Sequence, residues 1–533
     1  MAKAAEAMAM EDEDKGGQGM ALEVEGGDLE PQGEGMKPLS CAKLVGAWLW
    51  ENMGIAFDFG HFNKKDPFWI KEKGSNWFTE IRAGLVTFLT MSYILPANAA
   101  IMAIAMGQDK RGDLVIATAL VSAVASVLMG LMANFPLGVA PGMGLNAYFV
   151  FTVVLQKGLS WQEALTAVFV SGWLFLVTTV LGLRWFMLKL IPHGVQLALS
   201  AGIGLFLAFL GTQAGGGMGI IVGDEATLVR LNEPLSVEGN YDAHKMWISA
   251  LVFTVTVVMM AMNVKGAPLV GIIFGTIIAW SECWAQGPTS SVLLYPFGSC
   301  SDVAANGLNG TECFCYAPEK VVDVPRVATA GKLSFDILEK KQFWISVVTF
   351  YFNDLLGCAG TLIAVTRKAS IMDRHGNIPK RQANAAFVAD SVSTILGSVL
   401  GTSTVTTYIE SAAGIVDGGR TGVVAIVVGI CFSLSIPFAP LLSNIPDLAT
   451  GPIVVIVGAM MMTSVEGFEW SNVEDGLPAF LTLLLIPLTF NIAYGIIAGT
   501  IFWFIIQIFL IPYRLVKKED PLKRLKSIVM TKP

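Results

Sequence analysis

The sequence predicts an all-α integral membrane protein with about fourteen transmembrane helices, arranged as a repeat of two inverted halves. Three observations support this fold class: a very apolar composition, basic residues that fall on one side of the membrane, and strings that recur in both halves. Of the 533 residues, 54% are hydrophobic and only 14% are charged, and the mean hydropathy is +0.61. Soluble globular chains are more polar, so lipid rather than water must surround most of this protein.

The membrane domain is expected in two halves, residues 81–283 and residues 343–515, joined by an extracytoplasmic loop at residues 284–342. A helix needs about 20 apolar residues to cross a bilayer, and uncharged runs of that order recur along the chain. The expected spans are residues 82–106, 113–133, 138–155, 161–183, 194–212, 247–263, 266–283, 343–365, 384–400, 401–416, 421–440, 447–465, 475–492 and 494–513.

The segments outside the membrane domain differ in composition. Residues 1–43 form an acidic, Gly-rich tail without apolar periodicity, which we expect to be disordered and unsuited to nucleic acid. Residues 44–80 mix Trp and Phe with Lys, as in a segment that lies on the cytoplasmic membrane surface, although a packed cytosolic cap explains the same residues. Residues 516–533 form a basic tail.

Basic residues determine the predicted orientation, because Lys and Arg collect on the cytoplasmic side of membrane proteins. Lys110 and Arg111 are the exception, in a short loop that Asp109 and Asp113 nearly neutralise. Both termini are therefore expected in the cytoplasm. The basic residues on that side are Arg184, Lys189, Lys265, Arg367, Lys368, Arg374, Lys380, Arg381, Arg420, Arg514, Lys517, Lys518, Lys523 and Arg524.

The loop at residues 284–342 supports this orientation independently. It contains the sequence Asn309-Gly310-Thr311, which is an N-glycosylation sequon and requires an extracytoplasmic position. One or two disulfides are expected there, and four cysteines allow three complete pairings. These cysteines are Cys283, Cys300, Cys313 and Cys315.

Short strings recur at matching places in the two halves. Val86-Thr87-Phe88 opens the first span and Val348-Thr349-Phe350 the eighth, while Ile191-Pro192 precedes the fifth and Ile445-Pro446 the twelfth. An odd number of spans in each half requires the second half to enter the membrane upside down. This is the inverted-repeat plan that is typical of secondary transporters, whose sites form where helices break near the midplane.

The third and tenth spans contain such breaks. Residues 136–149 are rich in Pro and Gly, which cannot continue an uninterrupted helix. Residues 397–414 carry a run of β-branched hydroxyl residues, which favours a short extended segment leading into a half-helix. We therefore expect a short extended segment in each of these two spans.

Acidic side chains inside a membrane are functional candidates, because burying a charge in lipid is costly. Glu410, Asp354 and Asp390 lie nearest the expected membrane interior. We interpret Glu410 and Asp354 as functional rather than as helix caps or interhelical hydrogen bonds. Asp390 has Ser391 and Ser393 beside it, which favours a structural role.

Two further kinds of residue follow the breaks. Asn146 comes just after the first break, where ligand contact is favoured over the alternative of a buried anchor between helices. Phe149, Tyr148 and Tyr408 are explained by packing, although an aromatic ring at this place suits a planar ligand.

The chain resembles the AzgA-type hypoxanthine, adenine and guanine permeases of the nucleobase transporter superfamily, whose members are similar in fold to the uracil permease. The resemblance covers about residues 78 to 515, and the ordered set of strings is specific where single tripeptides are weak. The strings are residues 79–84 (TEIRAG), 87–91 (TFLTM), 140–149 (APGMGLNAYF), 201–206 (AGIGLF), 360–362 (GTL), 401–403 (GTS), 409–411 (IES), 418–422 (GGRTG) and 478–482 (PAFLT).

This resemblance implies a core unit of spans 1 to 4 and 8 to 11 and a gate unit of spans 5 to 7 and 12 to 14, with substrate between them in an elevator-like motion. It implies that Asn146, Asp354 and Glu410 match base-binding positions, and a carboxyl must carry any proton coupling because no histidine lies well inside a span. We therefore assign proton coupling to Glu410 and Asp354, and we expect no cofactor or metal. The assigned substrate-binding residues are Asn146, Asp354, Glu410, Phe149, Ser403, Thr404 and Thr361.

Two positions depart from the family pattern. Gly357 stands where the eighth span usually has a second acid, which puts the proton stoichiometry and the preferred base in question. Ala97-Asn98-Ala99 stands where Val-Asn-Pro is more frequent.

The expected function is proton-coupled uptake of adenine, guanine and hypoxanthine across the plasma membrane, with the endoplasmic reticulum as the alternative location. Cytokinin transport and pairing into a homodimer stay open. An anion transporter of the same fold and a non-transporting receptor are the alternative functions. A membrane enzyme is disfavoured because the sequence contains no HExxH, G-x-S-x-G or P-loop motif.

Overall fold

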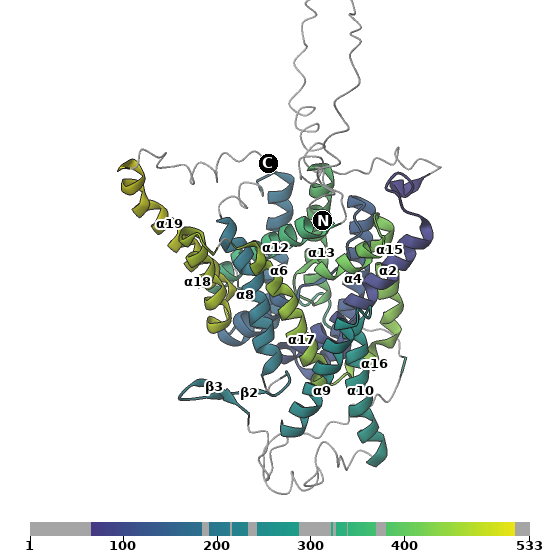
Figure 1. Ribbon diagram of the computed structural model, residues 1–533. Helices are drawn as coiled ribbons and strands as arrows, with labels where there is room; N and C mark the ends of the chain where they lie inside the picture. The colour runs from purple at the N-terminus through teal and green to yellow at the C-terminus, as the bar shows by residue number, and fades with distance from the viewer. Residues whose placement is uncertain are drawn as a thin grey trace, which may run out of the picture. The chain divides into compact units, whose positions relative to one another are not determined.

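The computed structural model describes residues 66–183, 191–213, 216–232, 242–286, 321–322, 327–337, 339–368, 380–468 and 470–516 (Figure 1). Among these residues, nine helices are long and apolar enough to cross a membrane. They are Trp77–Met106, Gln108–Ala133, Trp161–Val180, Gly194–Thr212, Lys341–Leu362, Arg381–Leu400, Gly422–Ser443, Asp447–Gly467 and Ile492–Val516. The chain is therefore a multi-pass membrane protein, as the composition predicts.

The helices of the first half follow the predicted spans closely. Three shorter apolar helices, Met143–Gln156, Met246–Ala261 and Ala267–Trp280, also lie in predicted spans of this half. In chain order the elements are α2 (Trp77–Met91), α3 (Ile94–Met106), α4 (Arg111–Ala133), β1 (Val139–Pro141), α5 (Met143–Ala147), the π-helix η4 (Tyr148–Gln156), α6 (Trp161–Val180), α8 (His193–Thr212), α9 (Asp242–Ala261) and α10 (Ala267–Gln286).

The second half has the same order of long helices around one short strand. Its elements are α12 (Lys341–Lys368), α13 (Lys380–Leu400), β4 (Val405–Thr407), the 3₁₀ turn η5 (Ile409–Ser411), α14 (Ala412–Val416), α15 (Gly422–Ser435), α16 (Ala439–Ser443), α17 (Asp447–Met461), α18 (Val473–Thr489) and α19 (Ile492–Val516).

The two strands β1 and β4 lie where the sequence predicts extended segments. They pair antiparallel, with Val139 opposite Thr407, Ala140 opposite Thr406 and Pro141 opposite Val405. Each strand interrupts its span, and a short helix begins within a few residues of its end. The two broken segments, far apart in the sequence, therefore meet inside the protein.

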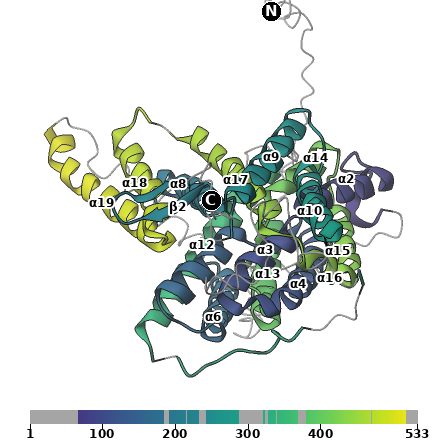
Figure 2. The same cartoon turned by 90° about the horizontal axis from the view of Figure 1, so that it is seen from below.

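Contacts between helices divide the described elements into two sets. The first set comprises α2, α3, α4, α6, α12, α13 and α15, and the second comprises α8, α9, α10, α17, α18 and α19. Figures 1 and 2 show α18 and α19 on one side and α2, α4 and α15 on the other. The short elements β1, β4, α5 and α14 contact mainly the first set.

The helix contacts are related by an exchange of the two halves. The pair α4–α15 corresponds to α13–α6, α8–α18 corresponds to α17–α9, and α18–α19 corresponds to α9–α10. The pairs α4–α13 and α8–α17 map onto themselves, as equivalent helices next to a two-fold axis must. This correspondence extends the sequence repeat to the packing.

Glycines allow two of these helix pairs to approach closely, which is the usual way that membrane helices pack. A Cβ atom on Gly422 would lie 2.1 Å from the carbonyl oxygen of Gly130, and one on Gly130 would lie 2.5 Å from that of Gly422. Gly204 and Gly458 oppose each other in the same way between α8 and α17. Any side chain at these contacts must separate the helices.

Some elements were not predicted, and some predicted features lie outside the described residues. A hairpin of β2 (Ile221–Asp224) and β3 (Leu228–Leu231) joins α8 to α9. Of the predicted interfacial segment, only residues from Asp66 onward are described, and Lys73 Nζ donates to the carbonyl oxygens of Asn134 and Arg420. Outside the described residues lie the predicted N-terminal tail, the predicted C-terminal tail beyond Val516, and Asn309, Cys300, Cys313 and Cys315. Cys283 lies in α10.

We expect Gly422→Ala to destabilise the protein by about 1–3 kcal/mol, because the new methyl group overlaps a backbone oxygen that cannot move without shifting α4. The measurement is thermal unfolding of the purified protein in detergent. Gly223→Ala is the control, because a Cβ there meets no atom within 4 Å. Equal melting temperatures for the two variants would contradict the close contact of α4 with α15.

Candidate functional site

The site is organised around the hydrogen bonds between β1 and β4. The Gly142 amide donates to the Thr404 carbonyl at 3.0 Å, and the Tyr408 amide donates to the Gly138 carbonyl at 3.1 Å. These bonds close the two ends of the strand pair. Because alternate residues of an antiparallel pair point their peptide groups outward, Val139 and Val405 must find partners elsewhere.

Two hydroxyl groups supply those partners in the same geometry. Ser126 Oγ, on α4, accepts from the Val139 amide and donates to the Val139 carbonyl, both at 3.1 Å. Thr394 Oγ1, on α13, lies 3.1 Å from the Val405 nitrogen and 3.0 Å from its carbonyl oxygen. Each strand is thus held by one hydroxyl of the helix that precedes it in its own half.

Asn146 lies in a buried cluster of amides and hydroxyls. Its Nδ2 donates to Asn98 Oδ1, and its Oδ1 accepts from the Ser403 hydroxyl. Asn98 Nδ2 donates in turn to Thr118 Oγ1 at 2.7 Å and to Thr402 Oγ1 at 3.2 Å. The cluster joins α3, α4 and α5 to the residues that precede β4, so Asn146 and Ser403 are brought together as predicted site residues.

Glu410 follows β4 in the turn η5 and is 8% exposed. The Tyr93 hydroxyl, at the junction of α2 and α3, donates to Glu410 Oε1 at 2.6 Å. Thr90 Oγ1 lies 3.4 Å from the Glu410 carbonyl oxygen. The carboxyl is therefore held inside the protein by the first span rather than turned toward lipid.

Asp354, on α12, occupies a different cluster. It is 3% exposed, and its Oδ2 lies 3.1 Å from Thr394 Oγ1, the hydroxyl that also holds Val405. The buried Asp390, on α13, interacts electrostatically with Asp354. Asp354 is thus linked to β4 through one hydroxyl, and Asp390 is its acidic neighbour.

The two predicted acids therefore have separate partners. Among the hydrogen bonds of the described residues, none joins Asp354 to Glu410. Asp354 is connected to the first residue of β4 through Thr394, whereas Glu410 lies just beyond the end of that strand. The chain from Val405 to Glu410 therefore separates the strand residue that is linked to Asp354 from Glu410 itself.

The remaining predicted site residues differ in their environments. Phe149 is fully buried, with its ring centroid 6.4 Å from that of Phe350. The Thr404 hydroxyl is buried and has no hydrogen-bond partner in the described part of the chain. The Thr361 hydroxyl donates to the Gly357 carbonyl at 2.9 Å, one turn earlier on α12.

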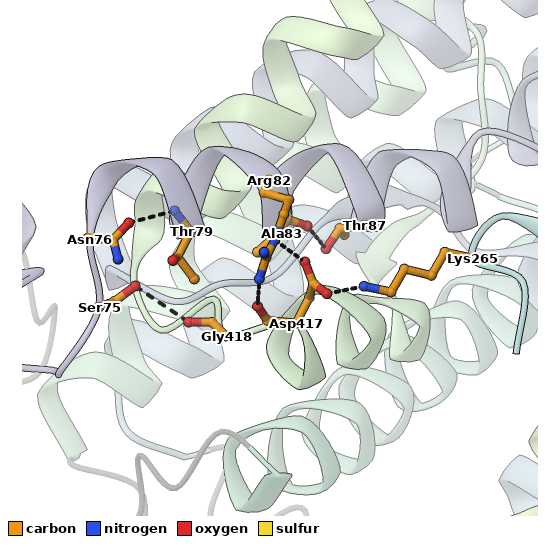
Figure 3. A network of polar contacts seen from close by, with 9 residues as sticks. All are labelled: Ser75, Asn76, Thr79, Arg82, Ala83, Thr87, Lys265, Asp417 and Gly418. Atoms are coloured by element: carbon orange, nitrogen blue, oxygen red, sulfur yellow. Dashed lines mark hydrogen bonds and ion pairs between the residues drawn. The ribbon is translucent and has the colours of Figure 1, made fainter.

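An ion-pair network joins α2 of the first helix set to the turn between α9 and α10 of the second (Figure 3). Arg82 Nε, on α2, donates to Asp417 Oδ2 at 2.7 Å, and Lys265, in the turn between α9 and α10, donates to Asp417 Oδ1. The hydrogen bond from Lys265, with a further one from Arg82, holds the pKa of the Asp417 carboxyl below its ordinary value. The Asp417 carboxyl therefore stays ionised at neutral pH.

A second set of polar contacts joins the helix sets elsewhere. Arg111 Nη2, at the start of α4, donates to the Ile445 carbonyl at 2.7 Å and to Asp447 Oδ1 at 3.1 Å, at the start of α17. The Thr152 hydroxyl donates to the Phe490 carbonyl. By the predicted topology, these contacts lie on the opposite membrane face from Asp417.

Four residues that hold this site are not among the predicted site residues: Tyr93, Asn98, Ser126 and Thr394. Asn98 stands in a string that departs from the family pattern, and its position inside the first span was the available signal. A buried Ser or Thr in a membrane helix is common and usually bonds to its own helix, so Ser126 and Thr394 carried no local signal.

Comparison with known proteins gives three findings. A model of the "Permease family" matches residues 78–498. The chain is 37% identical to the guanine/hypoxanthine permease PbuG of Bacillus subtilis, over 82% of this chain and 92% of that protein, and 34% identical to the adenine permease AdeP of Escherichia coli, over 83% and 89%. The fold is similar to the transmembrane domain of the cyanobacterium bicarbonate transporter BicA, with a TM-score of 0.52 and 14% identity over 79% of this chain and 96% of that chain.

We expect Thr394→Val to destabilise the protein by about 1–3 kcal/mol for each buried group that it leaves unpaired. Ser126→Ala removes the matching hydroxyl, but it leaves only the peptide groups of Val139 without a partner. The loss of unfolding free energy should therefore be smaller for Ser126→Ala than for Thr394→Val. The measurement is denaturant unfolding in mixed micelles. Thr394→Ser keeps the hydroxyl and should stay near the wild type, and equal losses for Thr394→Val and Ser126→Ala would contradict the link to Asp354.

Proposed function

Since the chain belongs to the permease family and is an integral membrane transporter, we propose that it is a secondary active transporter for purine nucleobases, driven by protons. Its similarity to PbuG and AdeP supports purines as the substrate class, with adenine, guanine and hypoxanthine as the expected bases. The observation that carries the proposal is the buried array of a carboxyl, an amide and hydroxyls around β1 and β4.

The chemistry of this array suits a purine. A purine is planar and uncharged, and its edge alternates N–H donors with ring-nitrogen or carbonyl acceptors. Glu410 offers an acceptor, the amide of Asn146 offers a donor and an acceptor, and the Thr404 hydroxyl offers either. We assign substrate binding to these residues together with Asp354, Ser403, Thr361 and Phe149.

Proton coupling is proposed for Glu410 and Asp354. The contacts of the Thr394 hydroxyl explain how a proton on Asp354 could change the site. This hydroxyl has one proton, but it lies within hydrogen-bond distance of two acceptors, Val405 O and Asp354 Oδ2. When Asp354 carries a proton, Thr394 can donate to Val405, as Ser126 does to Val139. When Asp354 is charged, it draws the hydroxyl proton, and the Val405 carbonyl loses its donor. Protonation of Asp354 thus changes the hydrogen bonds that hold β4.

We propose that the two helix sets act as a core and a gate that move relative to each other in an elevator-like way. The antiparallel β1–β4 pair and the exchange symmetry of the helix contacts support fourteen membrane segments, in two inverted halves of seven. The Asp417–Lys265 and Arg111–Asp447 contacts cross the boundary between the sets. Motion of the gate would have to break one or both.

The predicted topology completes the proposal. Both termini are placed in the cytoplasm, the plasma membrane is the expected location, and Asn309 is the expected glycosylation site. The same assignment places Asp417 and Lys265 on the cytoplasmic side. Cytokinins are further candidate substrates for the same kind of uptake assay, whereas pairing of two copies would be measured from the mass of the purified protein.

Uptake of labelled adenine, guanine, hypoxanthine and uracil at two pH values, in cells that lack their own carriers, tests the function. We expect the purines to enter faster at the more acidic external pH. Glu410→Gln should reduce this uptake about tenfold or more, because the amide cannot exchange a proton and replaces a charged hydrogen-bond acceptor. Its oxygen can still accept from Tyr93, so the fold should survive.

Glu225→Gln, in the exposed turn of the β2–β3 hairpin, is the matched control and should transport normally. Sulfate uptake that adenine does not inhibit would favour the alternative of an anion transporter. Binding of a base without exchange of labelled base across the membrane would favour a receptor. Near-normal, pH-dependent adenine accumulation by the Glu410→Gln variant would refute the role of Glu410.

A further inference from the structure

One face of α12 is open at the level of the site. A Cβ atom added to Gly357 or to Gly360 would meet no atom within 4 Å in the described part of the chain. Because an α-helix has 3.6 residues per turn, positions 353, 357 and 360 lie on one side of α12. The helix therefore presents a smooth, unfilled surface beside Asp354.

Asn353 lies on this face, and its side-chain amide has no partner among the described residues. It is 1% exposed, yet neither its Nδ2 nor its Oδ1 has a hydrogen-bond partner in the described part of the chain. Buried amides are normally satisfied, as Asn98 and Asn146 are in this protein. An unpaired buried amide next to open space is suited to a ligand that brings both a donor and an acceptor.

The open face adjoins buried residues of α12, because Gly357 and Gly360 are exposed whereas Asn353 and Asp354 are buried. Phe350 lies one helical turn before Asp354. It is fully buried and packs edge-on against Tyr148, with 5.1 Å between the ring centroids. Of the exposed apolar residues of this helix, Trp344 and Val348 lie on the other side, and Ile345 lies at the flank of the open face. In addition, α12 contacts η5 and α14 of the site and α8 and α19 of the second set.

We propose that the Asn353 amide determines substrate specificity by hydrogen-bonding to the exocyclic group of the bound purine and to the ring nitrogen beside it. The inference rests on the proposed function and extends it. An amide presents one donor and one acceptor side by side, which matches the N6 amino group and adjacent ring nitrogen of adenine. Rotated by half a turn, it matches the carbonyl oxygen and N1–H of hypoxanthine. Gly357 and Gly360 leave the room that this edge of the base requires.

The test compares adenine with unsubstituted purine, which lacks the exocyclic group, as competitors of labelled hypoxanthine uptake by the full-length protein. In the wild type we expect adenine to compete about tenfold better than purine, because purine leaves the oxygen of the buried amide without a donor. Asn353→Leu should bring this ratio close to one. A ratio is independent of the amount of protein in the membrane.

Tyr351→Phe is the matched control, because it removes a polar group from α12 that donates to Thr178 on the other side of the helix. It should leave the adenine-to-purine ratio unchanged. A wild-type ratio near one, or the same ratio in Asn353→Leu as in the wild type, would overturn the inference while purine transport itself remained. Absence of any purine uptake by the wild type would instead refute the proposed function, and the inference with it.

Asn353→Asp keeps the size of the side chain and replaces the amide donor, which tests the inference if the leucine variant does not fold. A carboxylate accepts but does not donate, so it leaves the ring nitrogen of adenine and the carbonyl oxygen of hypoxanthine each facing another acceptor. This variant should therefore weaken competition by both bases about tenfold relative to the wild type. Unchanged competition by both bases would overturn the inference.

Discussion

Lipid cannot hydrogen-bond to a peptide group, and this constraint decides how a chain can be broken inside a membrane. The strands β1 and β4 break two spans, and each supplies half of the partners that the other needs. The outward peptide groups of Val139 and Val405 then turn to the hydroxyls of Ser126 and Thr394. The two broken segments are therefore stable as a pair, and the pair fixes where the short helices begin and where Asn146 and Glu410 lie.

In both halves, a hydroxyl of the preceding helix pairs with the outward peptide groups of the strand. The two hydroxyls differ in their other contacts, and this difference indicates function. Ser126 serves only its strand, whereas Thr394 serves its strand and also Asp354. Glu410, in the second half, has Tyr93 of the first half as its partner. Both acids of the site therefore lie in the second half of the repeat. Asp354 shares the Thr394 hydroxyl with β4, and Glu410 accepts from Tyr93. In the proposed mechanism, a proton on such an acid changes the bonds that hold the strand beside the substrate.

Composition and local chemistry predict much of this structure, but they do not predict its long-range contacts. The Pro and Gly residues of the third span and the hydroxyl run of the tenth predict extended segments, and the strands lie there. The partner of Glu410 could not be predicted, because Tyr93 is one of many aromatic residues in apolar runs and only the packed fold brings it near. The same holds for the Thr394 hydroxyl. The assignment of Asp354 and Glu410 to one substrate site stays a prediction, and in the structure the two acids have different hydrogen-bond partners.

In the proposed transporter, a purine binds against the paired strands, between Glu410 and the open face of α12. A cryo-EM structure of the full chain with bound adenine would locate the base. We expect it within hydrogen-bond distance of the Glu410 carboxyl, with the β1–β4 pairing intact and the exocyclic amino group facing Asn353. Adenine bound away from the strands, with Glu410 still contacting only Tyr93, would contradict this placement.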